Sequence, residues 1–413
     1  MAGSSHRSIG RLTSVKTCVL LVMGLLAVLN STATSIAKEP LKSTDVRSLK
    51  SNAWERYAPG PWGRLERVRI TLAFPEELVP SEFPDAAREV EWFFPTPANS
   101  DFSAIVSRLQ LARNVGQHLL EVATLEEGGA VVKPSDTFVL NLSAESRSKL
   151  YRYLATSSRN ADHREPFAFN ALDLAARIEE SDLSTETIKA LSKLMYRNSD
   201  RVLFCDQRLL LRSIPDAGER REVVKLLYRF PTYMLRIRLN EDSDVEQLAR
   251  YWDPLGNRTI EELLRSVHRI ESNAAVIDVS LLLTSFARSR LYTYPRRSPL
   301  REWGPDCYWT AANFFRQEPD DAYFSPSLVA AFVNSKCDAI GDAPRFGDIA
   351  IFRRKDTSEP IHAAVYVAAD MFFTKDGNDY RVPWTVSFLA DIELQYGRHH
   401  GLSVHYARPR SGE

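Results

Sequence analysis

The chain has 413 residues, with 53 basic and 53 acidic side chains that give a formal net charge of zero at neutral pH. Lysine and arginine are interspersed with aspartate and glutamate, without the basic stripe or positive domain typical of nucleic-acid-binding proteins. The sequence therefore predicts no nucleic-acid partner. Its length exceeds the roughly 100 to 200 residues of a typical domain, so two or three folded cores are expected.

Residues 1–37 have the pattern of a secretory signal peptide. Basic residues precede an apolar run at 18–29, and the small residues Ser35 and Ala37 fit a cleavage site before Lys38. The run is too short to span a bilayer, which takes about 20 apolar residues; its retention as a short anchor is the alternative. We expect an exported mature chain without a membrane span, in the periplasm or outside the cell.

The exported chain would retain three cysteines, Cys205, Cys307 and Cys337. A bridge between Cys205 and Cys337 would leave Cys307 as the free thiol, and all three can equally stay reduced. The sequence has no Cys-x-x-Cys pair, and the histidine pair near its C-terminus lacks a companion motif. We expect no metal ion and no other cofactor.

Residues 38–142 are predicted to form a small α+β region. Polar and apolar residues alternate over 67–74 as in a strand, and 117–125 and 137–142 have a similar pattern. A helix is expected over 102–114.

Residues 143–290 are predicted to be mainly helical, because their apolar residues are spaced three and four apart. Ser184 is expected to cap one of these helices. The segment from Thr259 to Glu262 has the pattern of a capping box, in which each side chain satisfies the other's backbone amide. A last helix is expected over 278–290.

The C-terminal region, residues 291–413, contains a cysteine at an expected helix start. Asp306 can cap this helix, and Cys307 then lies in the positive field of the helix N-terminus. Such a field lowers the pKa of a thiol and favours the nucleophilic thiolate. A strand is predicted over 346–352, and His362 opens a second strand, where it would supply a proton acceptor.

This order of elements predicts a cysteine hydrolase, in which a helix carries the nucleophile and a sheet carries the histidine. The alternative is that Cys307 is a buried structural cysteine and His362 a hydrogen-bonded strand residue, since free cysteines are commonly buried. The position of each residue at the start of its element favours the catalytic interpretation.

Residues 291–409 resemble the NlpC-type papain-like cysteine peptidases. The shared pattern is an Asp-Cys helix start at Asp306 and Cys307, a Gly-Asp-hydrophobic strand at 347–349, and a His-x-x-hydrophobic-Tyr-hydrophobic strand at 362–367. The resemblance implies a papain-like fold, in which the cysteine helix packs on an antiparallel sheet. The predicted fold class is therefore α+β, with this domain following the helical region and the small α+β region.

The resemblance also implies three further site residues. In the family a tyrosine shortly before the nucleophile helps to hold the oxyanion, and Tyr294 is the candidate here. A polar residue on the strand after the histidine orients its ring, and an expected turn at 369–370 puts Thr374 in that register. Asp376 shares the same face of this strand.

The predicted chemistry is hydrolysis of an amide bond through a thioester. Cys307 attacks the carbonyl carbon, and His362 accepts the thiol proton and returns it to the leaving amine. Thr374 or Asp376 orients the imidazole. The Cys307 amide and Tyr294 stabilise the oxyanion. The resemblance implies peptides of the bacterial cell-wall polymer as substrates, and an acyltransferase or a deamidase would use the same residues.

A second hypothesis is an exported protein without catalytic activity. Its papain-like domain would bind a peptide or polymer, and its helical region would dock a protein partner. Tyr308 and Trp309 replace the Ser-Gly that usually follows the cysteine, and Thr374 replaces the usual histidine, asparagine or glutamine. These replacements favour the second hypothesis, and the intact cysteine and histidine favour the enzyme.

Overall fold

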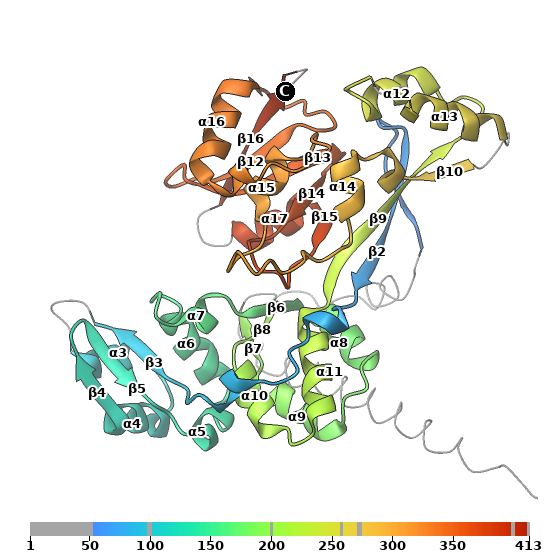
Figure 1. The fold of residues 1–413 in the computed structure, drawn as a ribbon. Coiled ribbons are helices and arrows are strands. Elements are labelled where there is room, and N and C mark those ends of the chain that lie inside the picture. The colour runs from blue at the N-terminus through green and yellow to red at the C-terminus, as the bar shows by residue number, and fades with distance from the viewer. Residues whose placement is uncertain are drawn as a thin grey trace, which may run out of the picture. The chain divides into compact units, whose positions relative to one another are not determined.

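The computed structural model describes residues 53–96, 101–198, 201–256, 259–270, 275–397 and 401–410. The predicted signal peptide, residues 1–37, lies outside these ranges. Among the described helices, none has both the length and the apolar character needed to cross a membrane. The chain combines helices with several antiparallel sheets (Figure 1), which confirms the α+β class.

The described residues form two compact units. Glu76–Leu227 make up the inserted unit, and Ser51–Pro75 together with Tyr228–Glu413 make up the main unit. The predicted boundaries after residues 142 and 290 do not separate these units.

The division arises from a pairing between distant strands. Strand β2 (Arg64–Leu72), which contains most of the strand predicted over 67–74, pairs with β9 (Phe230–Leu239) over its whole length. The register is antiparallel and ends with Leu72 opposite Phe230, so the inserted unit follows one strand and precedes the other (Figure 1). An alternating pattern marks a strand, but it does not identify the strand's partner.

The inserted unit contains helices and two small sheets. Its strands are β3 (Trp92–Pro95), β4 (Ala123–Glu126), β5 (Gly129–Val132), β6 (Phe167–Asn170), β7 (Tyr196–Asn198) and β8 (Arg201–Phe204). They form two antiparallel three-stranded sheets, in the orders β3-β5-β4 and β6-β8-β7. Its helices are α3 (Phe102–Arg108), α4 (Arg113–Val122), α5 (Asp136–Leu140), α6 (Ala144–Leu154), α7 (Ala161–Arg164), α8 (Ala171–Glu179), α9 (Thr185–Leu194), α10 (Gln207–Ser213) and α11 (Ala217–Tyr228), with 3-10 turns η1 (Glu76–Leu78) and η2 (Pro84–Ala87).

Two segments with a predicted strand pattern are helical in the structure. Most of 117–125 lies in α4, where Val115 and Leu119 are buried one turn apart. Most of 137–142 lies in α5, which starts at Ser135 because the serine oxygen accepts a hydrogen bond from a first-turn amide. Short apolar runs fit either structure, so burial of one helical face decides the outcome here.

The region 143–290 contains strands as well as helices. The predicted Ser184 cap is confirmed, since its side chain accepts a hydrogen bond from the Thr187 amide at 3.2 Å. However, β6 to β9 and a further strand at Ala275–Asp278 lie in this region. The last predicted helix, over 278–290, is instead a 3-10 turn followed by a short helix.

A buried ion pair lies in the core of the inserted unit. Arg147 on α6 donates from Nη1 to Asp206 Oδ2 at 2.6 Å, and both side chains are buried. The Tyr151 hydroxyl donates to Asp206 Oδ1 at 2.8 Å, and Arg147 Nη2 donates to the Val139 carbonyl oxygen at 2.7 Å. Burial raises the pKa of Asp206, and the Arg147 charge opposes this shift.

The main unit contains a four-stranded and a six-stranded sheet. Its other strands are β1 (Glu55–Arg56), β10 (Ala275–Asp278), β11 (Cys337–Ile340), β12 (Ile349–Arg354), β13 (Pro360–Ala368), β14 (Met371–Lys375), β15 (Trp384–Phe388) and β16 (Leu402–Pro409). The sheet orders are β1-β2-β9-β10 and β11-β16-β12-β13-β14-β15. Its helices are α12 (Val245–Trp252), α13 (Thr259–Ile270), α14 (Ser285–Arg290), α15 (Cys307–Ala312), α16 (Pro326–Lys336) and α17 (Leu389–Tyr396), with 3-10 turns η3 (Val279–Leu282) and η4 (Asp321–Phe324).

The two faces of the six-stranded sheet have separate cores, because successive side chains of a strand point to opposite faces. On the α15 face, Phe373 belongs to the same buried cluster as Trp309 of α15. On the α17 face, Phe372 belongs to the same buried cluster as Ile392 of α17. The strand predicted at 346–352 overlaps β12, and the strand predicted from His362 is β13, which begins at Pro360, so that His362 is its third residue and not its first.

Candidate active site

Asp306 and the first turn of α15 hold Cys307 in place. Asp306 Oδ1 accepts a hydrogen bond from the Trp309 amide at 2.7 Å, which confirms the predicted N-cap. Thr310 Oγ1 donates to the Asp306 carbonyl oxygen at 2.7 Å and accepts from Trp384 Nε1 at 3.0 Å. These bonds tie the helix start to β15. Cys307 is therefore fixed as the first residue of a helix that contacts β13 and β14.

His362 lies on the α17 face of the sheet. It is fully buried and pairs with Phe352 of β12. Its Nε2 lies 2.9 Å from Thr374 Oγ1, and its ring stacks on Tyr396 with centroids 4.4 Å apart and planes inclined by 17°. Its Nδ1 is buried and has no hydrogen-bond partner among the described residues. Thr374 thus makes the contact with the imidazole that its register predicts.

The Thr374 hydroxyl is linked to the tautomer of His362, because its single proton can go to only one of two acceptors. Thr374 Oγ1 also lies 3.3 Å from the Ala363 carbonyl oxygen. When the hydroxyl donates to this carbonyl oxygen, it accepts from His362 Nε2, which then carries the ring proton. The lone pair is then on Nδ1, and the basic atom of the imidazole is the one without a partner.

Asp376 lies beside the same imidazole without bonding to it directly. Its Oδ1 is 3.7 Å from His362 Nε2, which is too long for a hydrogen bond, and it accepts one from the Tyr396 hydroxyl at 3.2 Å. Burial raises the pKa of Asp376, and the Tyr396 hydroxyl and the Lys375 charge oppose this shift. Thr374, rather than Asp376, is the direct partner of the ring.

Cys307 lies next to the strand that carries His362. The backbone amides of Ala363 and Tyr308 lie close enough to its sulfur to lower the pKa of the thiol. Ala363 therefore acts on Cys307 through its amide and accepts a hydrogen bond from Thr374 through its carbonyl group. Among the described contacts, no hydrogen bond joins the Cys307 sulfur to His362, whose Nε2 is already occupied by Thr374.

Burial keeps both reactive groups neutral in this conformation. It raises the pKa of Cys307 to about 12, with the Asp306 carboxylate as the second cause, while the Ala363 and Tyr308 amides act in the opposite direction. Burial also lowers the pKa of His362 to about 3. The two side chains are a thiol and a neutral imidazole, not an ion pair.

The described partners of Tyr294, the predicted oxyanion residue, are Tyr228 and Phe74. Its hydroxyl donates to the Tyr228 carbonyl oxygen at 3.4 Å, and its ring meets Phe74 edge-on with centroids 5.6 Å apart. Neither partner belongs to the group around Cys307 and His362. The structure thus brings together four of the five predicted site residues, and the role of Tyr294 stays a prediction.

Two residues of this group carry no family motif. Tyr396 stacks on His362 because α17 packs on that face of the sheet, and nothing in the sequence around it indicates this contact. Lys375 is fully buried between Thr374 and Asp376. A lysine at the end of the apolar strand β14 is the sequence feature that could have indicated this site, since lysine is rarely buried unless its charge has a partner.

The described residues contain no group of three or more histidine, cysteine or acidic side chains that could hold a metal ion. Cys205, Cys307 and Cys337 are all free and buried.

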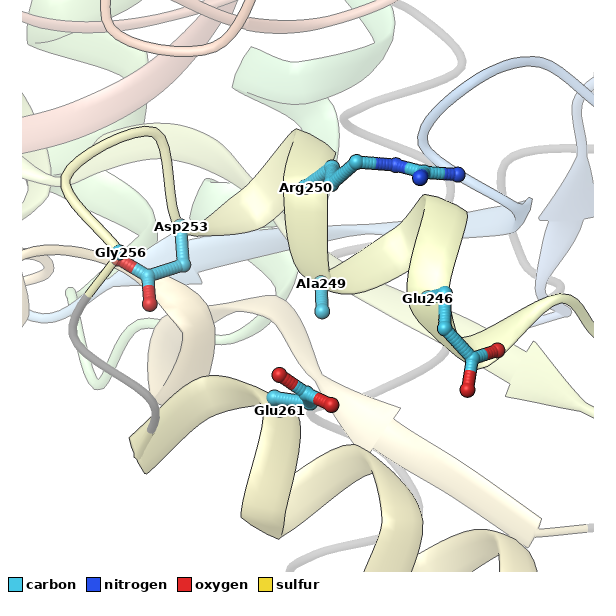
Figure 2. Close-up of a pocket in the computed structure, with 6 residues that line it drawn as sticks. All are labelled: Glu246, Ala249, Arg250, Asp253, Gly256 and Glu261. Carbon is cyan, nitrogen blue, oxygen red and sulfur yellow. The ribbon is translucent and has the colours of Figure 1, made fainter.

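A pocket of about 260 Å³ lies between α12 and α13 (Figure 2). It is lined by Glu246, Ala249, Arg250, Asp253, Gly256 and Glu261. Arg265 pairs with Glu246 and with Glu261, so two of the three carboxylates are already neutralised. None of the predicted site residues lines this pocket.

Acid should destabilise the main unit through His362. The pKa of this residue is about 3 in the folded chain and about 6.5 in an unfolded one. Between these values the unfolded chain binds more protons, so stability falls as the pH falls. From pH 7 to pH 5 we expect the wild type to lose about 2 kcal/mol more than His362→Phe in urea unfolding. The exposed-residue control His405→Phe should behave as the wild type; equal losses in all three proteins would contradict the prediction.

No family model matches this chain, and no curated protein or solved structure matches it either. Its function therefore has to be inferred from the residues of the site.

Proposed function

We propose that residues 291–413 form a papain-like domain of the NlpC type, which hydrolyses an amide bond through Cys307. One observation supports this more than any other: Cys307, His362 and Thr374 meet at the backbone of Ala363. The Ala363 amide acts on the sulfur and lowers its pKa, the threonine donates to the Ala363 carbonyl oxygen, and the imidazole belongs to the preceding residue. Nδ1 of His362 is then an unpartnered base beside the residue that holds the sulfur.

The proposed reaction uses this base in two steps. Nδ1 of His362 takes the thiol proton as the Cys307 sulfur attacks the carbonyl carbon, and the proton then passes to the leaving amine. Water hydrolyses the resulting thioester with the same imidazole as base. Thr374 accepts the hydrogen bond from Nε2 throughout, which keeps the ring in the required tautomer.

The reaction requires a movement that brings the two groups together. The sulfur and Nδ1 must come within about 3 to 3.5 Å for the proton to pass. His362 lies on the α17 face of the sheet and Cys307 on the helix of the α15 face, and no hydrogen bond joins them among the described contacts. The resulting contact would lower the thiol pKa, because the imidazole then accepts its proton.

Peptides of the bacterial cell wall are the proposed substrates, and the periplasm or the extracellular space is the proposed location. The support comes from the sequence, namely the motifs shared with the peptidase family and the signal-peptide pattern in residues 1–37.

A second candidate is a papain-like domain that binds peptide without cleaving it. The observation that favours it is the neutral state of the site: burial raises the pKa of Cys307 to about 12, and no hydrogen bond joins it to His362 among the described contacts. Tyr308, whose side chain is larger than the usual serine, also packs against the core beside the nucleophile.

The rate of Cys307 alkylation by iodoacetamide against pH distinguishes the two candidates. The experiment uses a chain whose other retained cysteines are removed by Cys205→Ala and Cys337→Ala. For a hydrolase we expect an apparent thiol pKa below the free value of about 8.5, and a rise of about one unit or more in His362→Ala. The rate near pH 7 would then fall about tenfold in that variant.

His163→Ala is the matched control for this measurement, because it removes another buried histidine, in the inserted unit. It should leave the alkylation profile unchanged. A thiol that is inert, or that titrates alike with and without His362, would reject the hydrolase and favour the binding domain.

A further inference from the structure

Lys375 is a buried cation at the end of β14. Its side chain is fully buried, and Nζ donates to the carbonyl oxygens of Gly377 at 2.9 Å and Asp379 at 3.0 Å. Lys375 is two residues from Phe373 on β14, so the alternation of the strand puts it on the α15 face. Its cross-strand neighbour is Trp384, which bonds to α15.

The acidic groups around Lys375 include the nucleophile. Burial lowers the pKa of Lys375 to about 8, and the acidic groups that oppose this shift are Asp376, Asp379, Cys307 and Asp306. The same lysine charge acts on Asp306, the cap of the cysteine helix. Groups from α15 and from the segment after β14 therefore face one buried ammonium group.

The ammonium group has one hydrogen more than its described acceptors use. Two carbonyl oxygens account for two of its three hydrogens, and no third acceptor is present among the described contacts. Two neutral acceptors on its own strand end fix the position of the charge without neutralising it. A buried charge of this kind acts strongly on neighbouring ionisable groups, because little water screens it.

We propose that Lys375 supplies the positive charge that stabilises the Cys307 thiolate when the reaction begins. The inference rests on the proposed hydrolase and adds a residue to its site. His362 removes the thiol proton from the α17 side, and Lys375 stabilises the resulting negative charge from the α15 side. The family pattern does not include this lysine, which lies on β14 between Thr374 and Asp376.

The test is the pH profile of Cys307 alkylation in Lys375→Gln, in the chain that lacks Cys205 and Cys337. Glutamine removes the charge but keeps donors for the Gly377 and Asp379 carbonyl oxygens. We expect the apparent thiol pKa to rise by about one unit, so that alkylation near pH 7 slows about tenfold, while the limiting rate at high pH is unchanged. Lys375→Arg, which keeps the charge, should retain the wild-type pKa.

Arg408→Met is the matched control. It removes a cation from the same sheet, where Arg408 pairs with the buried Asp348 at 2.7 Å. It should leave the thiol pKa unchanged, since the Arg408 charge is paired with the Asp348 carboxylate.

A second measurement does not depend on the folding of a lysine variant. The side-chain titration of Lys375 is followed by NMR in the wild type and in Cys307→Ala. Coupling between two sites is reciprocal, so removal of the thiolate should lower the pKa of Lys375 by about the same one unit.

The outcomes separate this inference from the proposed function. A thiol pKa that responds to His362→Ala but not to Lys375→Gln, with a Lys375 titration indifferent to Cys307, would overturn the role of Lys375 and leave the hydrolase intact. A thiol that responds to neither change would reject both.

Discussion

Replacing Arg147 by methionine is expected to lower the free energy of unfolding of the inserted unit by about 3–5 kcal/mol. The substitution keeps much of the side-chain volume and removes only the charge and its hydrogen bonds. Asp206, which is buried and receives both Arg147 Nη1 and the Tyr151 hydroxyl, would be left without its counter-charge. The loss should be smaller at acidic pH, because the Asp206 carboxyl then takes up a proton.

Urea unfolding of the wild type and the variant measures this loss. Lys149→Met is the control, because Lys149 forms an ion pair with the exposed Glu145 on the same helix. Loss of this exposed pair should lower the free energy of unfolding by less than about 1 kcal/mol. If Arg147→Met and Lys149→Met lowered the free energy of unfolding by the same small amount, the buried ion pair would contribute little to the stability of this unit.

Phe373→Ala should destabilise the main unit by about 3–5 kcal/mol, since it removes a fully buried ring and leaves a cavity. Phe373 packs in the cluster that joins α15 to the sheet, with its ring centroid 5.9 Å from that of Phe314. The neighbouring Thr374 and Lys375 hold the site from the same strand, so loosening β14 should also weaken the contact with His362.

Denaturant unfolding checks this prediction as well. Leu328→Ala on α16 is the matched control, because Leu328 is 48% exposed and its truncation should cost about 0.5 kcal/mol or less. If Phe373→Ala were as stable as the control, the prediction would be wrong, and the neighbouring side chains on the α15 face would have to move into the space left by the ring.

The sequence predicts those parts of the fold that depend on local signals. Asp306 and Ser184 cap helices because their side-chain oxygens accept hydrogen bonds from first-turn amides, which have no partner within the helix. The helices α4 and α5 were harder to predict, because short apolar runs fit a strand or a helix until their burial is known. The pairing of β2 with β9 is not local at all, and no spacing within either strand indicates it.

The candidate site also contains residues that local signals predict and residues that only the structure reveals. Cys307, His362 and Thr374 follow from the order and register of adjacent elements, and the structure brings them to one backbone residue. Tyr396 reaches the imidazole from α17, which lies in the chain between β15 and β16, so only the packing of this helix on the sheet reveals the contact. Tyr294 was placed by its distance along the chain from the nucleophile, and such a distance does not fix a direction in space.

The position of the inserted unit affects how the chain can fold during synthesis. Strand β2 leaves the ribosome before the inserted unit, and its partner β9 follows only after roughly 150 further residues. At roughly 5–20 residues per second, β2 waits on the order of ten seconds with its edge unpaired. The inserted unit can fold in that interval, whereas the main unit, with its cysteine helix, can be completed only after its last strand, β16, has been synthesised.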